Sequence, residues 1–122
     1  MTDASPHPSP TLLRRDPDAR MVVLVARAED TFEAVMTALL DAGVSGATVI
    51  ESRGLGAVLR TDLPIFTGLA ALLPGDSGSR MIVSFCTRAH VETLMRHLGA
   101  MPVDQRPVGA VIPVDGFFGF EP

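Results

Sequence analysis

The sequence predicts an α+β domain with the ferredoxin-like order βαββαβ, in which two helices cover one face of a four-stranded antiparallel sheet. Three observations lead to this prediction. Residues 21–26 and 81–85 are apolar runs of strand length, and each precedes a stretch with helical periodicity. A strand-like stretch follows each helical one, at 48–53 and at 108–114. Residues 54–80 join the two halves as a long connection.

The first predicted helix has start and stop signals of its own. Asp30 or Thr31 is placed to cap its N-terminus, and Glu33 could complete a capping box on Asp30. The face expected to be buried repeats at helical spacing and consists of Phe32, Val35, Met36 and Leu39. Gly43 is expected to end this helix, because glycine readily adopts the left-handed conformation that closes a helix C-terminus.

The second predicted helix begins after Thr87, a good N-cap residue, and ends at Gly99. Its expected buried face is formed by Val91, Leu94, Met95 and Leu98. Pro113 lacks an amide hydrogen, so the strand that contains it is expected either to lie at an edge of the sheet or to end at this residue.

The first and third strands are apolar on both of their faces. Val22 and Leu24 form one alternating set, and Val23 and Val25, which form the other, are equally apolar. An antiparallel sheet with one wet face should alternate between apolar and polar side chains. We therefore expect the second face to pack against another copy of the chain, which makes the protein a homo-oligomer. Cover by the chain's own residues 60–75 is the alternative.

Composition limits the possible classes of protein. The 122 residues suggest one domain over 20–120, preceded by a proline-rich tail over 1–19 that is expected to be disordered. Without an apolar run of about 18–20 residues or an apolar signal core, membrane insertion is not expected and a cytoplasmic location is. A net charge of −4 argues against nucleic-acid binding. The single cysteine, Cys86, is expected to be a buried apolar residue.

The most informative stretch is residues 43–56, which read GVSGATVIESRGLG. It resembles the nitrogen regulatory protein PII superfamily, in which a helix ends at G-V-x-G and the next strand runs into G-x-G. The similarity continues through residues 63–69, LPIFTGL, where a divergent PII-like group matches best. It extends more weakly over residues 20–119. The resemblance implies a trimer.

The resemblance also implies a nucleotide site in the cleft between adjacent subunits. The second strand and the base of the following loop form one wall of that cleft. Thr48 corresponds to a strand threonine that contacts the adenine base, and Gly54 and Gly56 match the G-x-G at the loop base. Arg53, directly before these glycines, is placed to meet a phosphate. An adenine nucleotide is thus the implied ligand.

The opposite wall departs from the family pattern. PII proteins carry T-G-x-x-G-D-G-K there, whereas residues 103–110 of this chain read VDQRPVGA. Gly109 is the glycine that remains, Arg106 is the only cation, and Pro107 removes an amide donor. A smaller or less charged ligand, such as a monophosphate nucleotide, suits this wall better than a triphosphate. That the cleft binds no nucleotide at all is an alternative.

The long connection contains an apolar segment with helical spacing, formed by Ile65, Phe66, Leu69, Leu72 and Leu73. It is either a structural helix or a partner-binding element in which Ile65, Phe66 and Leu69 make the contact.

No residues are marked as an acid/base pair, so the protein is not expected to be an enzyme. His90 and His97 lie about 10.5 Å apart along one helix, too far to chelate one metal ion. The predicted function is a PII-like regulatory protein that senses a small ligand and acts on a partner protein through the loop after Gly56. A ligand-free scaffold that binds partners through residues 65–73 is the alternative.

Overall fold

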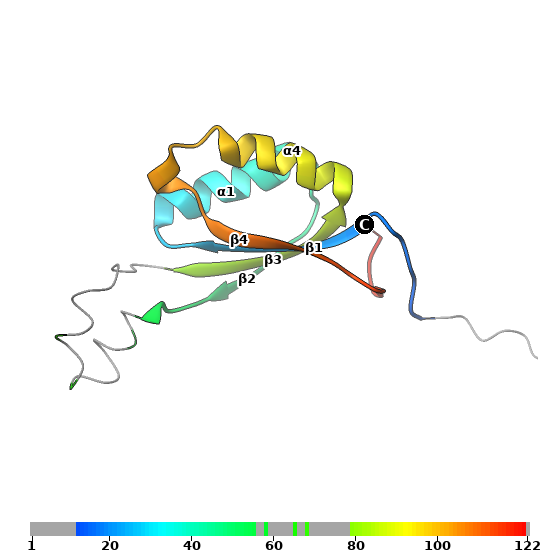
Figure 1. Ribbon diagram of the computed structural model, residues 1–122, viewed down its shortest axis with the longest axis horizontal. Coiled ribbons are helices and arrows are strands. Elements are labelled where there is room, and N and C mark those ends of the chain that lie inside the picture. The colour runs from blue at the N-terminus through cyan, green and yellow to red at the C-terminus, as the bar shows by residue number, and fades with distance from the viewer. Residues whose placement is uncertain (1–11, 56–57, 59–64, 66–67, 69–78, 122) are drawn as a thin grey trace, which may run out of the picture.

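The computed structural model describes residues 12–55, 58, 65, 68 and 79–121. Its elements are β1 (Ala19–Ala26), α1 (Glu29–Asp41), β2 (Thr48–Glu51), β3 (Arg80–Thr87), α4 (Arg88–Gly99), the short 3-10 helix η2 (Val103–Gln105) and β4 (Val108–Pro113). The four strands form one antiparallel sheet in the order β2-β3-β1-β4. Figure 1 shows α1 and α4 side by side on one face of this sheet. The ferredoxin-like prediction is confirmed.

The core lies between the sheet and the two helices. Its fully buried side chains include Val22, Val35, Ile82 and Leu94. The predicted helix faces are correct with one exception, Met95, whose side chain is 41% exposed. Met95 lines the groove between α4 and β4. β4 is an edge strand of the sheet, in agreement with the expectation for Pro113. No further strand lies beyond β4 in the described sheet to cover this methionine.

The start of α1 differs from the prediction. Ala28 occupies the N-cap position without a side-chain hydrogen bond, and the helix begins at Glu29. The carboxylate of Asp30 instead accepts a hydrogen bond from the Thr31 N–H at 3.1 Å. Because β1 ends at Ala26, the chain turns into the helix too early for Asp30 to act as the cap. Its negative charge in the first turn still favours the helix through the dipole.

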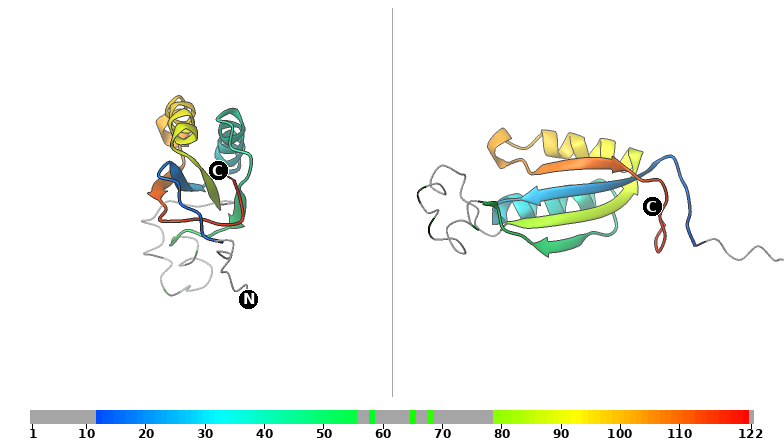
Figure 2. Two further views of the ribbon diagram at one scale, coloured as in Figure 1. Left: turned by 90° about the vertical axis from the view of Figure 1, so that its right-hand side faces the viewer. Right: turned by 60° about the horizontal axis from the view of Figure 1, so that its bottom comes forward.

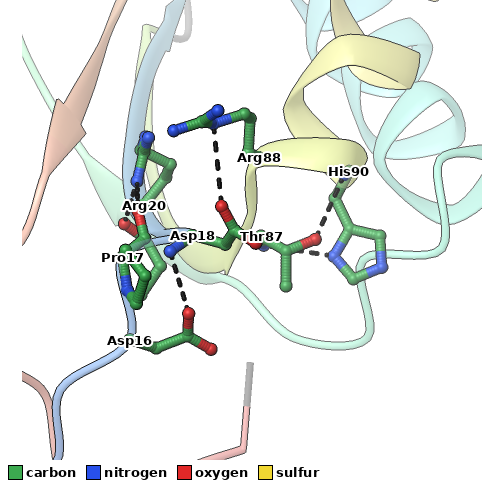
Figure 3. A network of polar contacts seen from close by, with 8 residues as sticks. Asp16, Pro17, Asp18, Arg20, Thr87, Arg88 and His90 are labelled. Atoms are coloured by element: carbon green, nitrogen blue, oxygen red, sulfur yellow. Dashed lines mark hydrogen bonds and ion pairs between the residues drawn. The ribbon is translucent and has the colours of Figure 1, made fainter.

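The start of α4 is as predicted, with Thr87 as N-cap. The Thr87 hydroxyl accepts a hydrogen bond from the His90 N–H, and His90 Nδ1 accepts one from the Thr87 N–H, both at 3.3 Å. Figure 3 shows this reciprocal pair. A histidine therefore takes the place that glutamate or glutamine usually fills in a capping box.

Gly43 closes α1 in the left-handed conformation, with φ of 85°. The Val44 N–H reaches back to the Leu39 carbonyl and the Gly43 N–H to the Leu40 carbonyl, both at 3.0 Å. These two bonds form a Schellman motif. Leu39 and Val44 both join the core, so this turn also directs the chain toward β2.

Replacing Gly43 with alanine is expected to lower the free energy of unfolding by about 1–2 kcal/mol, because a Cβ atom strains left-handed backbone. Chemical denaturation measures the change. Gly46→Ala is the matched control, since nothing lies within 4 Å of its added Cβ and its φ is not positive. Equal stability of the two variants would contradict the role given to the left-handed turn.

Part of the predicted tail makes defined contacts, so the expected disorder up to residue 19 is wrong for residues 12–19. Arg14 forms an isolated β-bridge with Phe117. The Asp18 carbonyl accepts from the Arg88 N–H at 2.8 Å, and their side chains lie 3.8 Å apart as an ion pair (Figure 3). The N-terminal segment is thereby fastened to the first residue of α4. Residues 1–11 lie outside the described residues.

The face of the sheet opposite the helices is apolar, as predicted. Cross-strand partners share this face in register: Val23 lies between Val83 and Ala110. The remaining apolar members are Met21, Val25, Met81, Phe85, Ile50, Val108 and Ile112. We call this surface the open face. Among the described residues, the C-terminal segment 114–121 crosses only one end of the open face (Figure 2). Residues 60–75, the alternative cover for this face, lie almost entirely outside the described residues.

Candidate functional site

The predicted site residues lie on two opposite edges of the sheet. At the β2 edge, Thr48 is the first residue of the strand, and Arg53 and Gly54 come shortly after its end. At the β4 edge, Arg106 comes just before the strand and Gly109 lies within it. Strands β3 and β1 lie between these edges (Figure 2). One chain therefore does not bring the two predicted walls together. Gly56 lies outside the described residues.

The β2 edge carries a pocket of about 220 Å³ beside Thr48. We call it the Thr48 pocket; it is lined by Ser45, Gly46, Ala47, Thr48, Val83, Ser84, Phe85, Phe120 and Glu121. Ser84, only 2% exposed, donates its hydroxyl hydrogen to the Gly46 carbonyl at 2.5 Å. This bond satisfies a buried polar side chain and holds the turn that precedes β2.

The base of the long loop is held by a second set of contacts. Strand β2 ends at Glu51, two residues earlier than predicted. Directly after it, the Ser52 N–H donates a hydrogen bond to the Ser79 carbonyl at 3.0 Å. The Arg80 guanidinium lies 4.4 Å from the centre of the Phe32 ring and forms ion pairs with Glu29 at 3.0 Å and Glu51 at 3.7 Å. These contacts tie the loop base to the first turns of α1.

The β4 edge carries a more apolar groove of about 320 Å³ between α4 and β4. Its lining consists of Leu24, Met95, Leu98, Gly99, Arg106, Pro107, Gly109, Ala110 and Val111. The Arg106 guanidinium donates to the Gly99 carbonyl at 2.7 Å and to the Met101 carbonyl at 3.0 Å. The predicted phosphate-binding cation thus stabilises the negative C-terminal end of α4.

Gly109 has a packing reason to be glycine. A Cβ atom there would lie 2.4 Å from the Val23 carbonyl oxygen and 2.7 Å from Leu24 Cδ2. The close approach of β4 to β1 therefore requires a glycine whether or not a ligand binds, and contact between Gly109 and a ligand stays a prediction.

Phe120 and Glu121 were not among the predicted site residues. They reach the Thr48 pocket because the C-terminal segment runs from the β4 edge to the β2 edge (Figure 2). The signal in the sequence was the concentration of aromatic residues near the C-terminus, where Phe117, Phe118 and Phe120 make up half of the six phenylalanines.

Several other predicted features can be located. Cys86 is buried as expected, and its burial raises the pKa of the thiol. Ile65 is 87% exposed, whereas Phe66 and Leu69 lie outside the described residues. Within the part of the chain that the structure describes, no three histidine, cysteine or acidic residues gather to hold a metal ion. No helix in that part has the length and apolar character needed to cross a membrane.

No protein-family model matches the chain, and no curated protein matches its sequence significantly. Solved structures are similar to it, among them the following two. Citrate-bound PII from Arabidopsis thaliana is 16% identical, with a TM-score of 0.48, over 82% of this chain and 80% of that one. CPII, a nitrogen regulatory PII-like protein from Thiomonas intermedia K12 bound to ADP, AMP and bicarbonate, is 16% identical, with a TM-score of 0.50, over 85% of this chain and 94% of that one. The latter match shows the fold.

Proposed function

We propose that this chain, which has the fold of the PII-like proteins, is a regulatory protein that senses an adenine nucleotide in clefts between its own copies. The observation that carries the proposal is the separation of the two candidate walls. The Thr48 pocket lies at the β2 edge of the sheet, and the groove between α4 and β4, which Arg106 lines, lies at the opposite edge. A contact that joins the β2 edge of one copy to the β4 edge of the next is heterologous, and repeating it around an axis closes a ring.

The open face supports such a ring. Val23, Val83 and Ala110 form the middle of an apolar surface, and the described residues cover it only at one end. Burying a surface of this kind removes apolar area from water at roughly 25 cal/mol per Å². We infer that three copies pack with their open faces inward, which places the β2 and β4 edges of neighbouring copies next to each other.

The ligand we propose carries few phosphates. The β4 wall offers Arg106 as its cation, and two of its N–H groups already bind carbonyls of the α4 terminus. Pro107 has no amide hydrogen to donate. A single phosphate needs fewer donors than a triphosphate. AMP, which is also bound in the structure of the Thiomonas intermedia protein, is therefore the first ligand to test.

Signalling would pass through the long loop. Because the loop base connects directly to β2, a ligand in the cleft can favour one loop conformation over others by binding it more tightly. The loop then presents a surface, including the exposed Ile65, to a partner protein. Such a regulator is proposed to act in the cytoplasm.

Thermal unfolding in the presence of AMP, ADP and ATP tests this function. AMP at 100 times its Kd is expected to stabilise the folded protein by about 2.7 kcal/mol. Thr48→Val should weaken AMP binding, whereas Thr37→Val, on the exposed surface of α1, should not. If no nucleotide raises the Tm, the ligand-free scaffold that uses residues 65–73 becomes the better account.

A further inference from the structure

We infer that Phe120 and Glu121 select the base that binds in the Thr48 pocket, and that Arg14 positions Glu121 directly and Phe120 through Phe117. The inference rests on the proposed function, since it assigns the chemistry of the same pocket. It predicts a preference for a base that carries an exocyclic amino group, as adenine does, over a base that carries a carbonyl at the same position.

The route of the C-terminal segment places these residues. After β4 ends at Pro113, the chain crosses beneath one end of the open face and arrives at the β2 edge (Figure 2). Phe117 is 5% exposed and anchors the crossing. The Phe120 ring centre lies 5.0 Å from that of Phe117 and 5.0 Å from that of Phe85 on β3. The segment is thus packed on the sheet and does not merely trail from it.

Arg14 joins the two ends of the chain at this point. Its backbone exchanges two hydrogen bonds of 2.9 Å with Phe117, and its guanidinium lies 5.7 Å from the centre of the Phe117 ring. The guanidinium also forms a hydrogen-bonded ion pair with one carboxylate oxygen of Glu121. The hydrogen bond and the charge of Glu121 both raise the pKa of Arg14. Arg14 therefore restricts the rotation of the Glu121 carboxylate, while both side chains stay exposed to solvent, at 52% and 76%.

The pocket that results combines an aromatic wall with an acceptor. Phe120 and Phe85 contribute ring surface on which a planar base can stack. The second carboxylate oxygen of Glu121 has no hydrogen-bond partner among the described residues. An ionised carboxylate can accept hydrogen bonds but cannot donate one, so it favours a ligand group that donates, such as an amino group. Its negative charge repels phosphate. A nucleotide would consequently bind with its base beside Thr48 and its phosphate directed away, toward the arginine-bearing walls.

Isothermal titration of the full chain with AMP and with inosine monophosphate tests this inference. The two nucleotides differ in the base: inosine monophosphate carries a carbonyl oxygen, which a carboxylate repels, in place of the amino group, and a hydrogen on the adjacent ring nitrogen. We expect the wild-type protein to bind AMP at least tenfold more tightly. In Glu121→Gln the side chain has both a carbonyl acceptor and an NH2 donor, so it can pair with either base. The preference for AMP over inosine monophosphate should therefore fall to within about threefold. Arg14→Gln should give an intermediate preference.

Phe120→Leu keeps an apolar side chain against Phe85 but removes the ring, and it should weaken AMP binding roughly tenfold, as expected for lost base stacking. Phe118→Leu is the matched control, because Phe118 lies on the same segment, is exposed and does not line the pocket. Thermal unfolding of each variant checks that it folds. If AMP binds the wild type but Phe120→Leu and Glu121→Gln bind both nucleotides as the wild type does, the inference is overturned and the proposed function survives. If AMP does not bind the wild type, both fall.

Discussion

Replacing Val23 with glutamate is expected to dissociate the proposed trimer into single chains that remain folded. Val23 lies on the central strand β1, opposite Val83 on one side and Ala110 on the other, in the middle of the open face. In a single chain this face meets water, so a carboxylate there is solvated. Between packed copies the same carboxylate would be buried without a partner, which costs several kcal/mol per ion.

Light scattering coupled to size exclusion measures this effect, and circular dichroism shows whether the fold persists. Leu40→Glu is the matched control, since Leu40 is an exposed apolar residue on α1, away from the open face. The control should retain the mass of the wild-type assembly. An assembly that tolerates glutamate at Val23 but not at Leu40 would show that copies meet through the helices instead.

Replacing Gly109 with alanine is expected to destabilise the protein by about 1–3 kcal/mol, the usual cost of overpacking a core. The added Cβ would lie 2.4 Å from a backbone atom, the Val23 carbonyl oxygen, and 3.3 Å from the Leu24 Cα atom. Backbone atoms within a ladder cannot move aside as a flexible side chain can. Relief would require β4 to shift away from β1, which would also lengthen the hydrogen bonds of the ladder.

Urea denaturation of Gly109→Ala beside Gly99→Ala measures this effect. Gly99 lines the same groove, but nothing lies within 4 Å of its added Cβ, and as the last residue of a helix it should accept alanine without loss of stability. A Gly109→Ala protein as stable as Gly99→Ala would contradict the packing account. It would leave ligand contact as the better reason for a glycine at this position.

The fold could be predicted because its strands and helices are long and strongly patterned. The boundaries were less accurate where tertiary contacts decide them. The sequence around Asp30 is typical of a cap, but the short connection after Ala26 places Ala28 at the N-cap position. The second strand was predicted to reach Arg53, but its ladder with β3 ends at Glu51, where Arg80 is the last partner.

The candidate site could be predicted only where it is local in sequence. The place of Thr48 at the start of a strand follows from the local sequence, whereas its contact with a base is implied by the family resemblance and stays a prediction; the structure puts it beside a pocket. Phe120 and Glu121 reach the same pocket from more than 70 positions away, and the ion pair that holds Glu121 joins it to Arg14, 107 positions earlier. Neither contact leaves a periodic signal. The steric requirement at Gly109 was equally hidden, because it depends on how closely β4 approaches β1.

The central claim is that the β2 edge of one copy, which carries Thr48, faces the β4 edge of another, which carries Pro107. Cross-linking can test this claim. A Thr48→Cys, Pro107→Cys protein treated with a short bismaleimide should give covalent species of two and three chains of 12.9 kDa each. Cys86 is buried and its thiol pKa is raised, so it should not react. The two single-substitution variants, each of which adds a cysteine at only one edge, should remain single chains on a denaturing gel. If the double variant also remains a single chain, the two edges do not meet and the shared cleft does not exist.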